Sequence, residues 1–276
     1  MRALKIITVI AAILVGVFSV VSYISNIGKD VAPVITCTAE ETIETSVNVP
    51  VEDLLKYVTA KDAQDGDISE KIKVSHKRFF IETKPYTTVV TFSVSDSDNN
   101  VTTLQRLLVL TDYKSPTISL TSDFIFPSGY TYDLKQYVKA SDTMDGDLND
   151  YIKVISPEFT SNEGEYPINI KVSNSMGDST EITFNAIVTG KDYFSTKIRL
   201  TDYIVFVPVG GQIDYNARIR DIFFNNVPKV YTVDDIKIDS TKADLSKPGT
   251  YDVFYRIYDD NGDVAAMTRL VVVVTE

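Results

Sequence analysis

The sequence has little of what enzymes and small extracellular domains commonly use. Its 276 residues include one cysteine, one histidine and no tryptophan. A single cysteine, Cys37, excludes a disulfide within the chain. This is unusual for a eukaryotic extracellular array of small domains and favours a bacterial surface. We expect Cys37 to be a small buried hydrophobe, with pairing to another molecule as the alternative.

Basic side chains are also scarce relative to acidic ones. The chain has 27 Lys and Arg against 38 Asp and Glu, which gives a formal net charge of −11 at pH 7. An acidic chain of this kind argues against binding to nucleic acid and against peripheral binding to anionic lipid. It is expected to be soluble outside the membrane and to attract divalent cations.

Charge is absent from one long segment near the start. The 19 residues from Ile6 to Ile24 carry none, and at 1.5 Å rise per residue they match a hydrocarbon core of about 30 Å. They predict a transmembrane helix within residues 1–28. Arg2 and Lys5 precede this helix, so the positive-inside rule places Met1 in the cytosol and the remaining chain outside the cell. The alternative is a signal peptide, cleaved near Ser22, that would release a secreted protein.

The clearest positive feature is an internal repeat. The 18 residues Tyr57 to Val74 return 80 residues later as Tyr137 to Val154, with ten positions identical. This period is too long for a solenoid unit and suits a small domain. Aligning the chain on the repeat predicts three tandem domains, at residues 31–113, 114–191 and 192–276, the last of them divergent.

Strand patterns dominate within each unit. The segment Thr87 to Ser95 alternates apolar and polar residues with period two, and Asn, Asp and Gly follow it, as tight hairpins with positive φ require. The sequence therefore predicts an all-β fold of three tandem immunoglobulin-like β-sandwich domains, each with two antiparallel sheets, arranged end to end after one N-terminal transmembrane helix. Only Leu54 to Ala60 and Leu134 to Ala140 look briefly helical.

The repeated motif also carries a family resemblance. It comprises Ala60, Asp62, Asp65, Gly66, Asp67, Ile68, Ile72 and Val74, the equivalent set from Ala140 to Val154, and the turns at Gly249-Thr250-Tyr251 and Asp259 to Gly262. With these residues the chain resembles the bacterial surface immunoglobulin-like domain, which occurs in tandem in Gram-positive surface proteins and in a class of pesticidal crystal proteins. The resemblance implies a binding or spacer module without enzymatic activity. The third unit lacks the Asp-Gly-Asp motif and has Arg220 to Asn225 in its place.

The repeated acidic residues are the strongest candidates for a metal site. Carboxylates are the hard oxygen ligands that calcium prefers, and the candidate ligands are Asp62, Asp65 and Asp67 in the first unit and Asp142, Asp145 and Asp147 in the second. The spacing is not that of an EF-hand, because the twelfth residue is Lys73 or Lys153. The alternative is a surface turn in which the Asp side chains cap backbone amides and the glycine takes positive φ.

The remaining sequence offers no catalytic set of side chains and one candidate contact surface. His76 and Cys37 lie in a unit whose copies lack both, and carboxylate pairs occur in turns rather than a cleft, so no enzyme is predicted. Apolar residues at Ile204 to Val209 and Asp221 to Val227 predict that the third unit contacts a protein or the cell wall, or that its core is reorganised. The predicted function is a membrane-anchored surface spacer that presents this distal unit for adhesion or assembly. A secreted binding module is the alternative.

Overall fold

The computed structural model describes residues 2–26, 31–76, 79–191, 195–225 and 230–276. Its first element is the helix α1 (Arg2–Asn26), whose side chains are described from residue 10 to residue 23. In the described part of the chain, no helix is long and apolar enough to cross a membrane, so the transmembrane helix predicted at Ile6 to Ile24 gains no support from the structure.

Contacts divide the chain into two compact units, Met1–Tyr113 and Lys114–Glu276. The first unit contains a β-sandwich, hereafter the first sandwich. Its elements are β1 (Val34–Cys37), β2 (Thr42–Thr45), α2 (Val51–Leu55), β3 (Val58–Asp62), β4 (Gly66–Asp67), the 3₁₀ turn η1 (Ser69–Lys71), β5 (Lys73–His76), β6 (Thr87–Ser95) and β7 (Val101–Leu110). One sheet has the order β1-β3-β4 and the other β2-β7-β6-β5. Cys37, at the end of β1, is half-buried.

The second unit contains two further pairs of sheets. The second sandwich has β8 (Thr117–Leu120), β9 (Ile125–Pro127), η2 (Leu134–Tyr137), β10 (Val138–Asp142), β11 (Gly146–Asp147), η3 (Asn149–Tyr151), β12 (Lys153–Ile155), β13 (Gly164–Ser173) and β14 (Ser179–Thr189). The third has β15 (Thr196–Leu200), β16 (Ile204–Pro208), η4 (Asn216–Arg218), β17 (Ile219–Phe224), η5 (Val233–Asp235), β18 (Lys237–Asp239), β19 (Gly249–Tyr258) and β20 (Val264–Thr275). The sheet orders are β11-β10-β8 with β12-β13-β14-β9, and β15-β17 with β16-β20-β19-β18.

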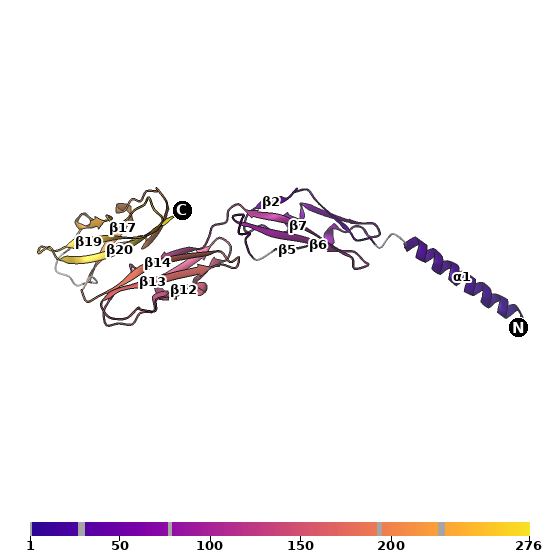
Figure 1. Ribbon diagram of the computed structural model, residues 1–276, viewed down its shortest axis with the longest axis horizontal. Coiled ribbons are helices and arrows are strands. Elements are labelled where there is room, and N and C mark those ends of the chain that lie inside the picture. Colours follow the sequence, from indigo (N-terminus) through magenta and orange to yellow (C-terminus); the bar gives the residue numbers. More distant parts are fainter. Residues whose placement is uncertain (1, 27–30, 77–78, 192–194, 226–229) are drawn as a thin grey trace. The chain divides into compact units, whose positions relative to one another are not determined.

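The long hairpins confirm the all-β prediction. In Figure 1, β6 runs beside β7 in the first unit, and β13 beside β14 in the second. The arm predicted at Thr87 to Ser95 is β6, and its apolar residues Val90, Phe92 and Val94 are buried. Period-two alternation thus places one face of the hairpin against the core. The connecting turns take positive φ, as the sequence predicts, at Asn99, Gly177 and Gly262.

Two details of the predicted sandwiches are wrong. The sheets are not purely antiparallel, because the short edge strands β2, β9 and β16 pair in parallel with β7, β14 and β20. These pairings join the start of each sandwich to its end, which local alternation does not reveal. The helical segments also end early, at Leu55 and Tyr137, and the strands β3 and β10 begin at Val58 and Val138. Pairing with β1 and β8 prevails there over the weak helical pattern.

The predicted end-to-end arrangement does not hold for the second and third sandwiches. Ile204 and Val271 of the third sandwich are buried in the same apolar cluster as Phe124 and Phe184 of the second. The apolar segment predicted at Ile204 to Val209 is therefore largely the strand β16, and it covers a neighbouring sandwich of the same chain. The other predicted apolar segment ends at residues 226 and 227, which lie outside the described ranges.

Candidate ligand cleft and the acidic turns

The acidic residues predicted as calcium ligands in the first sandwich form hydrogen-bonded turns. Asp62 Oδ1 accepts two backbone N–H groups, that of Asp65 at 2.8 Å and that of the preceding residue at 2.7 Å. The Asp65 carboxylate accepts the backbone N–H of Ser97 at 2.8 Å and its hydroxyl at 2.7 Å, and these bonds lower the pKa of Asp65. Asp67 Oδ1 accepts the hydroxyl of Ser69 at 2.6 Å and its N–H at 3.0 Å, which lowers the pKa of Asp67.

The second sandwich repeats this arrangement. Asp142 Oδ1 accepts the N–H of Asp145 at 2.6 Å. Asp145 binds Ser175 through the backbone N–H at 2.7 Å and the hydroxyl at 2.8 Å, and Asp147 Oδ1 accepts the N–H of Asn149 at 2.8 Å. Gly66 and Gly146 take φ of 75° and 71°. These contacts are those of the turn that the sequence leaves open as the alternative to calcium.

No metal centre is formed by these side chains as they lie. Within the ranges that the structure describes, no group of three His, Cys, Asp or Glu side chains could hold a metal ion. The calcium site at Asp62, Asp65 and Asp67 and its counterpart in the second sandwich stay a prediction.

One atom distinguishes the two turns. In the second sandwich, Asp142 Oδ2 accepts the side-chain amide of Asn174 at 2.8 Å. The equivalent of Asn174 in the first sandwich is Asp96, as the Ser97 and Ser175 contacts show. Asp96 has no amide to donate, and Asp62 Oδ2 is buried without a hydrogen-bond partner. A buried acceptor without a donor costs stability.

The paired change Asp96→Asn and Asn100→Asp gives the first sandwich the residues of the second at these positions. We expect it to raise the free energy of unfolding of the first unit by about 1 kcal/mol, because it supplies a donor to Asp62. Urea unfolding measures the change. The reverse exchange at Asn174 and Asp178 is the matched control and should destabilise the second unit. A loss of stability in the first unit would contradict the assignment.

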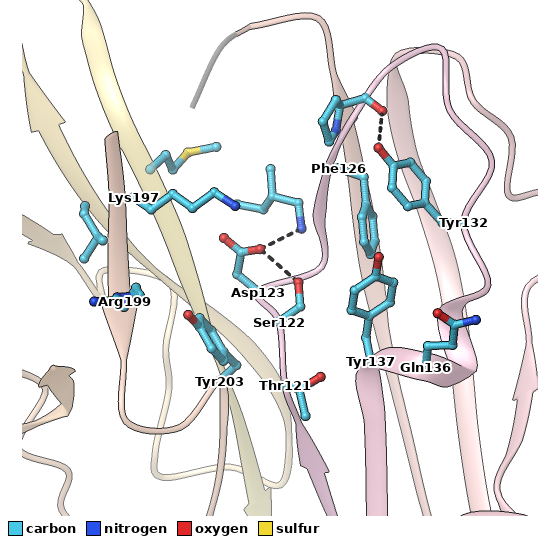
Figure 2. A pocket seen from close by; sticks show the side chains of 14 residues that line it. Thr121, Ser122, Asp123, Phe126, Tyr132, Gln136, Tyr137, Lys197, Arg199 and Tyr203 are labelled. Carbon is cyan, nitrogen blue, oxygen red and sulfur yellow. Dashed lines mark hydrogen bonds between the residues drawn. The ribbon is translucent and has the colours of Figure 1, made fainter. Parts of the chain in front are cut away.

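A cleft lies between the second and third sandwiches, within the unit Lys114–Glu276. Its volume is about 690 Å³, within the range typical of ligand pockets, and pockets often occur at domain boundaries. Figure 2 shows residues of the second sandwich on one side and Lys197, Arg199 and Tyr203 of the third sandwich on the other. Asp123 lies between the two sides. The cleft therefore needs both sandwiches to exist.

Aromatic side chains form the wall contributed by the second sandwich. The ring of Phe126 lies 4.5 Å from that of Tyr132 and 5.2 Å from that of Tyr137, between ring centroids. The Tyr132 hydroxyl donates to the carbonyl of Pro127 at 3.1 Å, a bond drawn in Figure 2. Gln136 on η2 is exposed at the same wall. This wall combines ring surface with polar groups that hydrogen-bond.

Cationic side chains line the opposite wall. Lys197 and Arg199 are two residues apart on β15 and so point to the same face of the strand. Two guanidinium nitrogens of Arg199 donate to the Asp221 carboxylate, Nε to Oδ1 at 2.5 Å and Nη2 to Oδ2 at 2.9 Å. Asp221 therefore fixes the orientation of Arg199 at the edge of the cleft.

Asp123 is held firmly between the two walls. Its Oδ1 accepts the backbone N–H of Ile125 at 3.1 Å, and its Oδ2 accepts the Thr268 hydroxyl of the third sandwich at 2.9 Å. Burial raises the pKa of Asp123, although these hydrogen bonds and the charges of Arg269 and Lys197 oppose the rise. Burial likewise raises the pKa of Tyr203 beside it. The hydrogen bonds of Asp123 join the two sandwiches.

Arg269 closes the boundary behind the cleft. Its side chain is 0% exposed and donates to two carbonyl groups of the second sandwich, Asn185 O at 2.5 Å from Nη1 and Asp123 O at 2.9 Å from Nη2. The guanidinium also lies 5.3 Å from the centre of the Phe184 ring. The guanidinium forms a salt bridge with Asp252, whose Oδ1 lies 3.5 Å from Nη1. The third sandwich thus supplies a buried cation to the second.

The sequence singles out none of the charged residues of the cleft. Asp123, Lys197 and Arg269 lie outside the repeated motif, and the divergent third unit offers no equivalent to compare. A usable signal is Tyr137, which opens the repeated stretch and lies beside the aromatic segment from Tyr130 to Tyr132. The pattern of core residues gives no indication that a further wall comes from the next sandwich.

Comparison with known proteins yields one distant relative by sequence. No protein-family model matches the chain. The pesticidal crystal protein Cry22Aa of Bacillus thuringiensis is 26% identical over 234 residues, which is 81% of this chain and 30% of that protein. The chain thus spans less than a third of the length of this relative. Cry22Aa belongs to the class of proteins that the repeated motif resembles, at an identity too low to assign a family.

Solved structures of β domains show only loose similarity. The CBM51-2 and INT domains of ZmpB from Clostridium perfringens, in complex with GlcNAc, match 56% of this chain and 41% of that chain with 18% identity and a TM-score of 0.23. The protocadherin gamma B4 extracellular domain matches 90% of this chain and 50% of that chain with 12% identity and a TM-score of 0.20. At these TM-scores neither structure assigns a function, and the cleft must be interpreted from its own residues.

Proposed function

We propose that the chain is a non-enzymatic surface binding module whose ligand occupies the cleft of the unit Lys114–Glu276. The cleft itself carries the proposal, because it joins an aromatic wall to a polar, cationic wall in a volume suited to a ligand. The first sandwich then acts as a spacer, and the second and third sandwiches together form the distal binding unit. The sequence, by contrast, predicts that the third unit alone contacts the partner.

The hydrogen bonds of the Asp123 carboxylate favour a role in binding over a role in catalysis. Both of its carboxylate oxygens accept hydrogen bonds, from Ile125 and Thr268. Among the described residues that line the cleft, Asp123 is the only carboxylate, whereas glycoside hydrolysis generally requires two. The carboxylate is therefore better suited to holding the two walls together than to moving protons.

Location at the cell surface is part of the proposal. The uncharged run from Ile6 to Ile24 supports export, either as a membrane anchor or as a signal peptide cleaved near Ser22. Extraction of cells with alkaline carbonate separates the two cases. An anchored chain is expected in the lipid pellet, and a secreted one in the medium, while recovery from the cytosol would overturn both.

Thr121→Trp tests the cleft directly. Thr121 is exposed and lines the cleft, so an indole there is expected to fill it with little effect on folding. We expect the wild-type chain to sediment with isolated bacterial wall material and Thr121→Trp to bind this material at least tenfold more weakly, a loss of about 1.4 kcal/mol or more. Lys139→Trp, at an exposed position on β10 outside the cleft, is the matched control. Equal binding by all three chains would contradict the proposal.

A further inference from the structure

We infer that the first sandwich is a load-bearing link, built to resist a pull between its two ends. The inference rests on the proposed function, in which the cell holds the N-terminal segment and the ligand holds the cleft. A pull between the cell and the ligand then enters the first sandwich near Val31 and leaves it at Tyr113. Resistance to this load depends on how the strands next to those two ends are paired.

The strands nearest the two ends lie side by side and run in the same direction. β2 pairs in parallel with β7 over the whole of Thr42–Thr45 (Figure 1). At the start of this ladder, the Leu107 N–H donates to the carbonyl of Glu41 at 2.9 Å. At its other end, the Thr111 N–H donates to the carbonyl of Thr45 at 2.9 Å. A pull on the start of β2 and on the end of β7 slides the two parallel strands past each other, so these bonds are loaded together.

Side chains bond the same two segments beyond the ladder. Near the start of β7, the Thr102 hydroxyl donates to the carbonyl of Pro33 at 2.6 Å. Further along β7, Arg106 Nε donates to the carbonyl of Ala39 at 3.0 Å. Both acceptors lie in the segment that leads into β2. The chain from residue 33 to residue 45 is therefore bonded to β7 at intervals, in the same order along both segments.

Asp112 bonds the two segments at the end where the load leaves. Its carboxylate accepts the Ser46 hydroxyl at 2.6 Å and the Val47 N–H at 2.8 Å, and these bonds lower the pKa of Asp112. They join the residues just after β7 to the residues just after β2. The next residue, Tyr113, is 5% exposed, and its ring centroid lies 4.7 Å from that of Phe80. A pull at Tyr113 therefore reaches Asp112 before it reaches the ladder.

The direction of the pull determines how easily the two strands part. A sliding pull must break the ladder and the side-chain bonds nearly together, after a short movement. A pull that lifts β2 from β7 at one end opens the pairs one after another, over the whole length of the strand. Forced unfolding is governed by the unfolding rate. The first sandwich should therefore unfold more slowly when the strands slide than when they are peeled apart.

Constant-force unfolding of the full chain, with the load applied to the first sandwich alone, tests the inference. Handles are attached to cysteines at exposed positions, in a chain that also carries Cys37→Ser. Val31→Cys with Lys114→Cys applies the sliding pull, and Val51→Cys with Lys114→Cys peels β2 from β7. At equal force, we expect unfolding with the first pair of handles to be slower by on the order of tenfold or more.

Asp112→Ala separates resistance to load from general stability. Asp67→Ala is its matched control, because the Asp67 carboxylate also accepts a serine hydroxyl, at 2.6 Å, and a backbone N–H, at 3.0 Å, both from Ser69. We expect the two variants to shift urea unfolding by similar amounts. Under the sliding pull, Asp112→Ala should unfold about tenfold faster than Asp67→Ala, because Asp112 joins the two loaded segments and Asp67 binds within its own turn.

The remaining outcomes separate this inference from the proposed function. Equal unfolding rates with the two pairs of handles would overturn the inference, and so would equal rates for Asp112→Ala and Asp67→Ala under the sliding pull. If a variant does not fold, the comparison of the two pairs of handles still decides. Binding of the wild-type chain to wall material is measured separately. Its failure would overturn the proposed function and leave the resistance to load standing.

Discussion

Arg269→Ala is expected to lower the free energy of unfolding of the unit Lys114–Glu276 by about 3–5 kcal/mol. The side chain is fully buried and reaches from the third sandwich to carbonyl groups of the second. Its removal leaves Asn185 O and Asp123 O without these donors and Asp252 without its opposite charge. It also leaves a cavity beside Phe184, which adds to the loss.

The first sandwich shows why the second needs this arginine. There, Arg106 donates from its own sandwich to Gln105 O at 2.8 Å and to Ala39 O at 3.0 Å. Gln105 and Asn185 occupy the same place, since the residue two positions after each donates its N–H to the carbonyl of the residue that precedes the edge strand. The second sandwich has Ala186 where the first has Arg106. In the second sandwich, the guanidinium of Arg269 from the third sandwich therefore takes the place that Arg106 has in the first.

Urea unfolding of the full chain measures the effect of Arg269→Ala. Arg256→Ala is a suitable control, because Arg256 forms a partly exposed pair with Asp239 at 3.0 Å, and such pairs contribute about 1 kcal/mol or less. We expect the transition of the second unit to move to lower urea and that of the first unit to stay in place. Equal effects of the two substitutions would mean that Arg269 does not join the sandwiches.

A fragment of residues 31–191 is expected to lack a stable second sandwich. Removing the third sandwich takes away Arg269 and the buried Ile204 and Val271. Two buried aliphatic side chains contribute about 1.5–3 kcal/mol each. The two hydrogen bonds from the charged guanidinium add about 1.5–3 kcal/mol each, so the loss is on the order of 6–12 kcal/mol. A domain commonly has only about 5–15 kcal/mol of stability in total. The second sandwich should therefore unfold.

Limited proteolysis of this fragment gives the readout. We expect residues 114–191 to be digested while residues 31–113 resist, because the first unit has its own core and its own arginine. The intact chain under the same protease is the control. A resistant core that extends to residue 191 would show that the second sandwich is self-sufficient. Deletion of the third sandwich is accordingly a poor test of ligand binding, and point changes in the cleft are preferable.

The sequence predicts the hairpins well because their information is local. Alternation defines β6 from Thr87 to Ser95, and Asn and Gly at the turns supply the positive φ that the hairpins need. The Asp-Gly-Asp stretches are also recognisable as turns, since Asp62 and Asp67, like Asp142 and Asp147, bind backbone N–H groups two or three residues away. Local residue chemistry is sufficient for these features.

The cleft and the boundary behind it could not be predicted in the same way. Asp123 and Thr268 meet across 145 residues, and Arg269 reaches Asp123 across 146. Such pairings leave no periodic pattern in the sequence. From its residue type alone, an arginine in a strand is expected to be exposed. The parallel edge strands are not predictable from the sequence for the same reason, since β2, β9 and β16 are short and pair with the distant end of their own sandwich.

Hydrogen–deuterium exchange of the full chain, with and without isolated bacterial wall material, locates the binding site. If the ligand occupies the cleft, peptides that cover residues 121–137 and 196–203 should exchange more slowly when it is bound. Peptides from the first sandwich should exchange at an unchanged rate, as expected of a spacer. Protection confined to the first sandwich, or to the turns at Asp65 and Asp145, would contradict a binding site in the cleft.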